Sequence, residues 1–350
     1  MKKKIIILIV ILVILSGIGV GIYFLSNRKT NEDTQKILLE EEIKIEQPKI
    51  EIFSGEERPF AVMLDNNKNA WPHASINKAY LAYEIIVEGG ESRIMALFKG
   101  VNVDSIGPIR SARHYFLDYA LENDAIYTHL GWSPQAQADI SNLGINNING
   151  QAYDSGKAKT STALFWRSNS KAKPHNAYTN IECLKIISER LKYRTTSDKE
   201  SVLNYVVSEV DLDNNESAIN ANSVTIPYAS SNKIKYVYNT ETKMYEKYSK
   251  GKLQKDETTG ETVVTKNIII TKAQNYTLND GENKGRQGLN NIGTLEGYYI
   301  TNGKAINITC KKDSRKGQTK YLDSNGKEIE VNDGKTFINI CPIDANIVIE

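Results

Sequence analysis

The chain has 350 residues, 25% of them charged, and a formal net charge of +2 at pH 7. This near balance excludes a general electrostatic attraction to nucleic acid or to acidic surfaces, so no nucleic-acid partner is predicted. The three cysteines form no Cys-x-x-Cys pair, the four histidines are scattered, and no Gly-rich phosphate loop or dinucleotide fingerprint occurs, so neither a metal site nor a cofactor is predicted.

The N-terminal segment has the pattern of a membrane anchor. An uncharged run from Ile5 to Leu25 follows three lysines and precedes Arg28. At about 1.5 Å rise per residue, such a helix spans about 31 Å, close to the hydrocarbon thickness of a bilayer. The length of the run and the large residues at its end favour an uncleaved helix at 1–29 over a cleaved signal peptide. We therefore predict a single-pass protein of the cell membrane with an extracytoplasmic body, joined to the helix by a polar stalk at 30–57.

A first globular domain is expected at 58–194. Apolar patterns predict strands at 60–64, 93–98 and 125–129, and helices at 110–122 and 181–193. Ser133 and Pro134 provide an N-cap and a first turn for a further helix that ends near Leu143. Because strands and helices alternate, this domain is predicted to be α/β or α+β.

A polar linker at 195–222 leads to a second domain at 223–350 that is predicted to be mostly antiparallel β. Three dipeptides that supply the positive φ angles of tight hairpin turns stand between strand-like runs: Asn302-Gly303, Asn325-Gly326 and Asp333-Gly334. Runs at 233–238 and 243–248 predict another hairpin, and 267–271 predicts a fully buried strand. The predicted fold class of the whole body is α+β.

The segment 106–113 carries the clearest candidates for ligand binding. Arg110, Ser111 and Arg113 follow a Gly-Pro turn at the expected start of a helix. Free N–H groups at a helix N-terminus, together with two guanidinium groups and a hydroxyl, favour the binding of phosphate or carboxylate. The same arginines could instead form structural ion pairs with nearby carboxylates.

Arg93 and Asn176 complete the predicted ligand-binding set. Glu84 and Glu88 are four residues apart and would share one face if this segment were helical. Two such carboxylates can divide the roles of acid and base when their environments differ. A solvated helix face with an ion pair to Arg93 is the structural alternative.

Catalysis is a second hypothesis, with Asp65, Glu88 and His175 as the candidate catalytic residues. Asp65 follows a buried strand, and His175 lies on a turn before the last helix of the domain. A serine, histidine and carboxylate arrangement could be assembled from Ser111 or Ser133 with His129 or His175. The spacing does not require it, and the Gly-x-Ser-x-Gly elbow of the hydrolases is absent.

Several of these segments together resemble the YerB-like family of bacterial envelope lipoproteins, a domain of unknown function. They are Arg58–Asn66, Tyr83-Glu84 through Val87–Gly89, Ser92-Arg93, Gly107–Arg113, Pro174–Asn176 and Asp333–Thr336. The resemblance covers about 58–342 and implies an α/β sandwich-like domain followed by a β-rich C-terminal domain in the cell envelope. It supplies no reaction. The chain departs from many members in lacking the lipid-bearing cysteine, so a membrane helix would replace the lipid as the anchor.

We therefore expect a membrane-anchored extracytoplasmic protein that binds an anionic cell-envelope ligand or an envelope protein. The alternative is a hydrolase or transferase that acts on cell-envelope polymers, and the sequence leaves open whether the protein is an enzyme. It also leaves open whether Cys310 and Cys341 form a disulfide or are two buried thiols. Convergence of the candidate residues in one pocket would favour a site, whereas arginines held in buried ion pairs away from any cleft would favour a scaffold.

Overall fold

The structure is a computed structural model that describes Arg28 and residues 49–350. Ile50–Glu350 form one compact unit. The predicted anchor at 1–29, apart from Arg28, and the predicted stalk as far as residue 48 lie outside the described residues. Within the part of the chain that is described, no helix has both the length and the apolar character needed to cross a membrane.

The end of the predicted stalk contacts the globular body. The backbone N–H groups of Glu51 and Ile52 donate to the carboxylate of Asp333 at 2.8 and 3.0 Å. Phe53 packs edge-on against the ring of Tyr80, with the two ring centroids 5.5 Å apart. Residues 50–53 are therefore fixed to the body by hydrogen bonds and by apolar contact.

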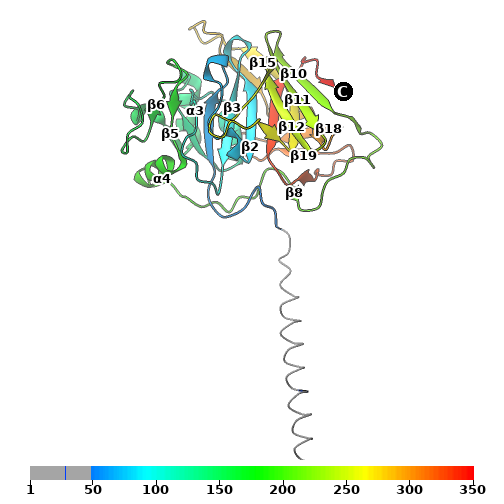
Figure 1. Ribbon diagram of the computed structural model, residues 1–350. Helices are drawn as coiled ribbons and strands as arrows, with labels where there is room; N and C mark the ends of the chain where they lie inside the picture. The colour runs from blue at the N-terminus through cyan, green and yellow to red at the C-terminus, as the bar shows by residue number, and fades with distance from the viewer. Residues whose placement is uncertain (1–27, 29–48) are drawn as a thin grey trace, which may run out of the picture. The chain divides into compact units, whose positions relative to one another are not determined.

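Figure 1 shows the elements of the first half of the body, together with those of the second. The first half contains β1 Phe60–Asp65, η1 Lys68–Ala70, η2 Ile76–Lys78, β2 Leu81–Ile86, η3 Glu88–Gly90, β3 Ser92–Phe98, α2 Phe116–Glu122, β4 Ile126–His129, α3 Pro134–Leu143, β5 Asn147–Asn149, η4 Gly150–Ala152, β6 Trp166–Arg167, β7 Ala177–Tyr178 and α4 Ile181–Arg190. The second half contains β8 Tyr205–Val206, β9 Ile219–Asn220, β10 Ser223–Ala229, β11 Asn232–Asn239, β12 Met244–Ser249, β13 Lys252–Leu253, β14 Val264–Thr265, β15 Asn267–Thr277, β16 Gln287–Asn290, β17 Gly293–Thr301, β18 Lys304–Lys312, β19 Lys320–Leu322, β20 Val331–Asn332, β21 Thr336–Pro342 and β22 Val348–Ile349.

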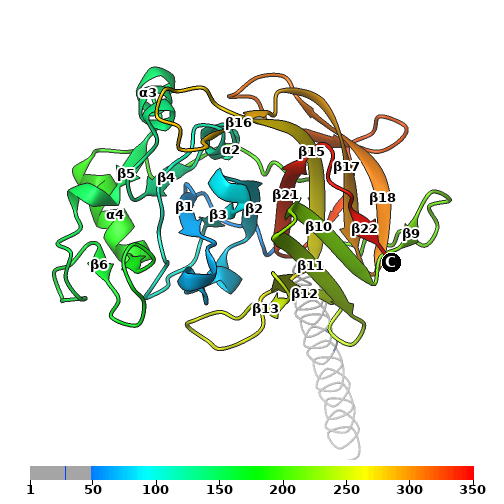
Figure 2. The same cartoon turned by 90° about the horizontal axis from the view of Figure 1, so that it is seen from above.

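One 12-stranded sheet runs through both halves of the body. Its main path has the order β19-β18-β17-β15-β21-β2-β3-β1-β4-β5, with β16 on β15 and β9 on β18. The strand β21 lies parallel to both β15 and β2, so that Ile340 faces Thr271 on one side and Ile85 on the other. Figure 2 shows β21 between these two strands. Strands from either side of the predicted linker therefore share one continuous hydrogen-bonded sheet.

The large sheet is buried on both faces, which explains why its central strands are almost entirely apolar. Side chains alternate between faces along each strand, so Met63 and Val62 belong to different hydrophobic clusters. The first cluster includes residues of α2 and α3, and the second includes residues of α4 and of a smaller sheet with the order β13-β12-β11-β10-β22. In Figure 2 these layers lie on opposite sides of the large sheet.

Most of the predicted elements are present. Strands form at β1, β3, β4 and β15, the hairpins β11–β12 and β17–β18 close at the expected turns, and α4 begins at Ile181. Ser133 caps α3 as predicted, because its side chain accepts a hydrogen bond from the N–H of Ala136. The α+β class fits, although strands dominate, and the regular α-helices within the described residues all precede Leu191.

Two predicted elements are wrong. The helix expected at 110–122 begins only at Phe116. The backbone of Arg110 instead pairs with two strands: its N–H donates to Met63 of β1, and its carbonyl accepts from Leu130, which follows β4. The hairpin expected at Asp333-Gly334 does not form, since β20 pairs with β8 while β21 enters the middle of the large sheet. In both places pairing with distant strands overrides the local pattern.

Candidate functional site

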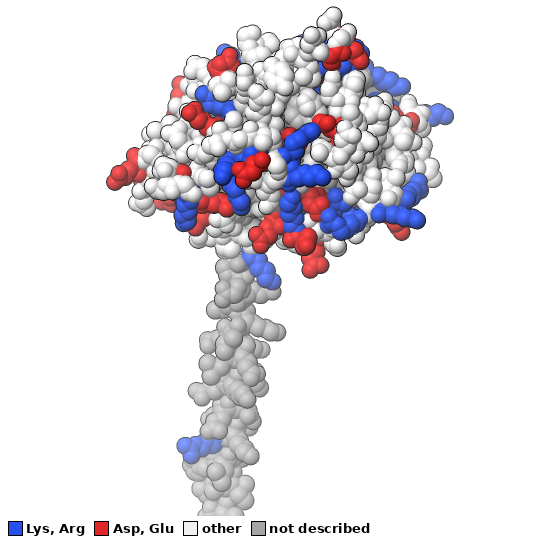
Figure 3. All heavy atoms as spheres, turned by 180° about the vertical axis from the view of Figure 1, so that it is seen from behind, with Lys and Arg blue, Asp and Glu red and all other residues white. Residues whose placement is uncertain are grey.

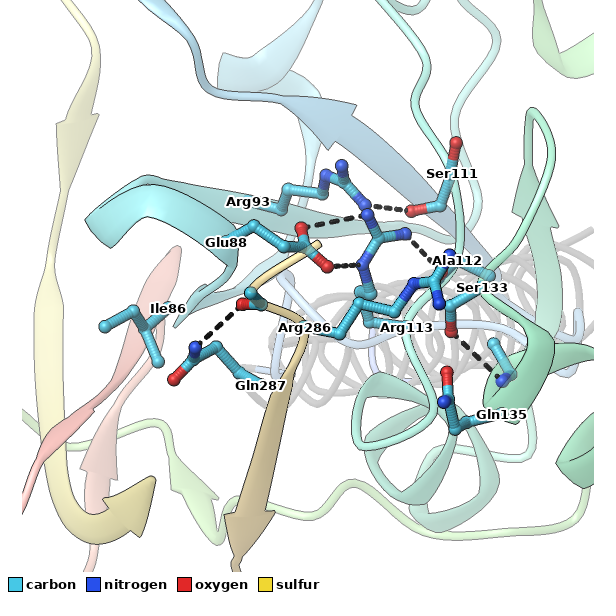
Figure 4. Close-up of polar contacts among 12 residues, drawn as sticks. Ile86, Glu88, Arg93, Ser111, Ala112, Arg113, Ser133, Gln135, Arg286 and Gln287 are labelled. Carbon is cyan, nitrogen blue, oxygen red and sulfur yellow. Dashed lines mark hydrogen bonds and ion pairs between the residues drawn. The ribbon is translucent and has the colours of Figure 1, made fainter. Parts of the chain in front are cut away.

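A polar cavity of about 360 Å³ lies where β1 and β3 meet the segment that contains Arg110 and Arg113. Five cationic side chains line it: Arg93, Arg110, Arg113, Lys284 and Arg286. Figure 4 shows Arg93, Glu88 and Arg113 beside one another, with Arg286 reaching toward them. The net charge of the chain, +2, does not reveal this local cluster of cations. Figure 3 shows basic and acidic side chains interspersed over one face of the molecule.

The cavity also contains acidic groups. Three carboxylates, Asp65, Glu88 and Glu91, line it together with His175. The lining therefore combines a cationic majority with acids and one imidazole. The predicted residues Asp65, Glu88 and His175 thus share one cavity with the predicted arginines and with Ser111.

Arg93 is the buried cation of this cavity that has no carboxylate partner within the described residues. It lies at the start of β3, is 7% exposed, and donates from Nη1 to the carbonyl oxygen of Ser111 at 2.6 Å. Arg110, Arg113 and Arg286 each form an ion pair, but Arg93 forms none with any carboxylate of residues 49–350. Burial, followed by the nearby charge of Arg113, lowers the pKa of Arg93 from 12.5 to about 10.

Arg113 and Glu88 form a two-pronged ion pair. Nε and Nη2 of Arg113 donate to the two carboxylate oxygens of Glu88 at 2.5 and 2.9 Å. Burial acts to raise the pKa of Glu88, but the hydrogen bond and charge of Arg113 outweigh it, so this pKa lies below its usual value. Glu88 is therefore an ionised partner of Arg113 rather than a proton donor at neutral pH.

Asp65 joins Arg110 and His175 at the end of β1. Its Oδ2 atom lies 2.7 Å from Nδ1 of His175 and 3.1 Å from Nε of Arg110, although the latter contact lacks the alignment of a hydrogen bond. Its Oδ1 atom accepts from the backbone N–H of Asn67 at 3.2 Å. Asp65 is 4% exposed, so its contact with the imidazole of His175 is largely shielded from water.

The segment that contains Arg110 is extended, which corrects the prediction of a helix N-terminus. The N–H of Arg110 donates to the Met63 carbonyl at 2.9 Å, and the N–H of Leu130 donates to the Arg110 carbonyl at 2.9 Å. Gly107 permits this path, because a Cβ there would lie 2.7 Å from the carbonyl oxygen of Ala177. The anion-binding groups are therefore side chains on a strand-like segment rather than the free amides of a helix.

Several predicted residues have other roles. The hydroxyl of Ser111 donates to the carbonyl of Leu130 at 3.0 Å, and Ser133 is occupied as the cap of α3. Asn176 is outside the cavity lining, where its amide donates to the carbonyl of Ser168 and its oxygen accepts from Arg167. His129 is buried with its ring nitrogens at Gly131 and Asn147. A triad through either serine is therefore not assembled.

Two basic residues of the cavity come from the second half of the chain and were not predicted. Lys284 and Arg286 lie in the connection between β15 and β16, and the ion pairs of Arg286 with Asp280 and Glu282 fix its guanidinium. Hydrogen bonds to Glu282 and Asp280 raise the pKa of Arg286 above its ordinary value. No local pattern distinguishes this polar connection from other loops, because its position depends on the pairing of distant strands.

A buried polar network supports the strand ends that carry the site. Glu84 on β2 is 0% exposed, and it accepts hydrogen bonds from Asn66 at 2.9 Å and Ser92 at 2.7 Å. Its other oxygen lies 2.8 Å from Nζ of Lys247 on β12. Asn66 follows Asp65 and Ser92 precedes Arg93, so this network fixes two residues of the cavity from behind. Glu84 and Glu88 do not share a helix face, because Glu84 lies on a strand and faces the core.

Neither a metal nor a cofactor site is assigned. Among the described residues no group of three or more His, Cys, Asp and Glu side chains is arranged to hold a metal ion. Cys183, Cys310 and Cys341 are buried free thiols. Cys310 instead accepts a hydrogen bond from the hydroxyl of Thr271.

Comparison with known proteins supports the resemblance inferred from the motifs. Residues 47–196 match the N-terminal domain, and residues 224–338 match the C-terminal domain, of a family described as protein of unknown function (DUF3048). The chain is 28% identical over 302 residues to "Putative lipoprotein YerB" of Bacillus subtilis (strain 168), which covers 83% of each chain. The crystal structure of YerB protein from Bacillus subtilis superposes with a TM-score of 0.73, covering 87% of this chain and 100% of that one. The chain therefore belongs to the DUF3048 family.

Proposed function

We propose that the protein is a membrane-tethered extracytoplasmic binding module and that its cavity binds one anionic group, a phosphate or a carboxylate, of a cell-envelope component. One observation carries this proposal. The guanidinium of Arg93 is buried at the cavity and forms no ion pair with a carboxylate of the described residues. A buried charge without a partner is costly to the folded state. A ligand anion would supply the missing countercharge.

The surrounding groups favour a planar or tetrahedral oxyanion. Guanidinium groups present parallel N–H donors that match two oxygens of a carboxylate or phosphate. Arg93 keeps only one hydrogen bond to the protein within the described residues, to the Ser111 carbonyl, so its other N–H groups are available to a ligand. Arg110 and Arg286 line the same cavity and extend the cationic surface.

The proposed location rests on the predicted N-terminal helix and on the relative YerB. The name of YerB describes a lipoprotein, a class of protein held at a membrane by a lipid. The apolar run Ile5–Leu25 would provide the same tethering in this chain. Because residues 50–53 are fixed to the body, a polar stalk of about 20 residues, 30–49, would then hold the body up to roughly 65–70 Å from the membrane surface.

The proposal is tested by calorimetric titration of the full-length chain, kept in a mild detergent, with inorganic phosphate and with acetate. We expect saturable binding of at least one anion and a loss of roughly 10–100-fold in affinity in Arg93→Gln, since a charged hydrogen bond contributes about 1.5–3 kcal/mol. Arg190→Gln is the matched control, because Arg190 is an exposed arginine in the last turn of α4. Absence of binding, or equal loss in both variants, would refute the proposal.

A further inference from the structure

The cavity lined by Arg93 and Arg110 also contains a group that is able to transfer a proton, the imidazole of His175, which pairs with Asp65. Nδ1 of His175 lies 2.7 Å from Oδ2 of Asp65. An ionised carboxylate only accepts hydrogen bonds, so the proton of a neutral imidazole is on Nδ1 and the lone pair is on Nε2. Within the described residues Nε2 has no hydrogen-bond partner, and His175 lines the cavity. The imidazole is thus oriented as a base beside the arginines.

We propose that the cavity hydrolyses a phosphodiester, with His175 as the general base and Arg93 as the group that binds the phosphoryl oxygens. This inference rests on the proposed anion-binding function and adds a reaction to it. The residues of the proposal come from three separate parts of the chain, β1, β3 and the turn before β7. Their convergence in one cavity is therefore a property of the fold and not of a local motif.

The charge of the site favours a diester over more highly charged anions. Arg113 is neutralised by Glu88, and Arg286 is neutralised by Asp280 and Glu282. Of the five cations that line the cavity, Arg93 alone forms no ion pair within residues 49–350. A phosphodiester carries one negative charge spread over two non-bridging oxygens, so it matches one guanidinium in both charge and geometry. A bound carboxylate would offer no comparable electrophile to a base.

The proposed step consumes one water molecule. Nε2 of His175 takes a proton from the water as its oxygen forms a bond to phosphorus, and the phosphorus–oxygen bond to one alcohol breaks. The departing alkoxide takes a proton from solvent water, and the imidazolium returns its proton to solvent. One diester and one water thus give one alcohol and one phosphomonoester. Arg93 stabilises the negative charge that grows on the phosphoryl oxygens.

Asp65 is a positioning residue in this scheme. It keeps the proton on Nδ1 and fixes the plane of the imidazole, which leaves Nε2 as the acceptor. Its own position is fixed by the N–H of Asn67 and by the ion pair with Arg110. The network of Asn66, Ser92 and Glu84 then holds the adjoining residues of both strands.

The test uses the full-length chain in mild detergent with bis(p-nitrophenyl) phosphate, whose leaving group needs no proton and therefore isolates the role of the base. We expect turnover by the wild-type chain and a loss of roughly 10²–10⁴-fold in kcat in His175→Gln, with KM and the affinity for dimethyl phosphate nearly unchanged. Asp65→Asn is expected to lower kcat more than it changes KM. His114→Gln is the control, because His114 does not line the cavity.

The outcomes separate this inference from the proposed function. Binding of dimethyl phosphate without turnover, or turnover that is equal in His175→Gln, would overturn hydrolysis and leave anion binding in place. Absence of binding would overturn both. Vesicles of phosphatidylglycerol and soluble glycerophosphoglycerol then distinguish a lipid headgroup from a free diester through the glycerol or glycerol phosphate released. Hydrolysis of neither diester would overturn the proposal.

Discussion

Two buried charges on neighbouring strands are treated in opposite ways by this fold. Glu84 on β2 is 0% exposed and is paired with Lys247, which is 1% exposed, while Asn66 and Ser92 donate to its other oxygen. Arg93 on β3 is also buried, but it opens on a cavity and has no carboxylate partner within the described residues. The register places these residues one pair apart, since Glu84 faces Ile94 while Arg93 faces Ile85.

The contrast separates a structural charge from a functional one. The pair of Glu84 and Lys247 is enclosed, its two charges compensate each other, and Asn66 and Ser92 satisfy the Oε1 atom of Glu84. Arg93 uses only one of its N–H groups within the described residues. A buried guanidinium in this state lowers the stability of the unliganded protein, and its remaining N–H groups can bind a ligand anion. Loss of the first charge should damage the fold, whereas loss of the second should damage binding alone.

The largest expected effect comes from breaking the enclosed pair. Glu84→Gln keeps the size of the side chain but leaves Lys247 buried without a countercharge, which should lower the free energy of unfolding by roughly 3–5 kcal/mol. Denaturation in urea measures this loss. The double variant with Lys247→Met should recover most of it, because no unpaired charge then remains. A double variant as unstable as the single variant would show that the ion pair is not the cause.

Arg93→Met should have the opposite profile. The affinity for phosphate or acetate should fall by roughly 10–100-fold, equivalent to about 1.5–3 kcal/mol, while the unliganded protein unfolds at equal or higher urea concentration. Titration calorimetry and urea denaturation of the same preparation measure both quantities. If Arg93→Met lowered the free energy of unfolding as much as Glu84→Gln does, Arg93 would be a structural charge like Glu84.

Lys335 extends the comparison to a buried amine that contacts no carboxylate of residues 49–350. Its Nζ atom donates to the Ile76 carbonyl at 2.6 Å, and burial lowers its pKa from 10.5 to about 7. Since the unfolded chain then binds more protons between about pH 7 and pH 10, this group makes stability rise with pH over that range, by at most about 1.4 kcal/mol per pH unit.

The measurement is the difference in unfolding free energy between the wild type and Lys335→Met at several pH values. The wild type should gain relative to the variant as the pH rises above 7. Lys78→Met serves as the control, because Lys78 is exposed and lines, together with Lys335, a second cavity that does not include Arg93. A flat difference for Lys335→Met would mean that this amine is charged in the fold throughout the range.

The smallest expected effect concerns the partner of Arg113. Glu88→Gln removes the carboxylate that neutralises this guanidinium, so the cavity gains a second cation without a countercharge. Anion affinity should increase by roughly threefold to tenfold, or about 0.6–1.4 kcal/mol. Glu182→Gln, at an exposed position of α4, is the matched control in the same titration. Weaker binding in Glu88→Gln would indicate that the carboxylate itself contacts the ligand.

The elements that were predicted correctly have a local cause. The strands β1 and β3 are short apolar runs, α3 begins at a serine followed by proline, and Asn302-Gly303 supplies a tight turn between two strand patterns. Each depends on residues close together in the chain, so periodicity and turn chemistry are sufficient to identify it.

The parts that could not be predicted depend on distant partners. Nothing near Glu84 indicates that a lysine 163 residues later neutralises it, and helical spacing to Glu88 suggested a solvated face instead. Arg110 lies on extended backbone because Met63 and Leu130 hydrogen-bond to it. The candidate residues Asp65, Arg93, Arg113 and His175 could be chosen from their chemistry, but their convergence and the contribution of Arg286 required the topology.

The central place of β21 also sets an order for biosynthesis. This strand is the last in chain order of the strands in the large sheet, yet it joins β15 to β2. A ribosome therefore releases the strand that connects β15 to β2 after every other strand of the large sheet, and the nascent chain cannot close this sheet before Pro342 has emerged. Such late, non-local closure slows folding and keeps the polypeptide open during its early life, which is compatible with passage through a translocation channel before it folds.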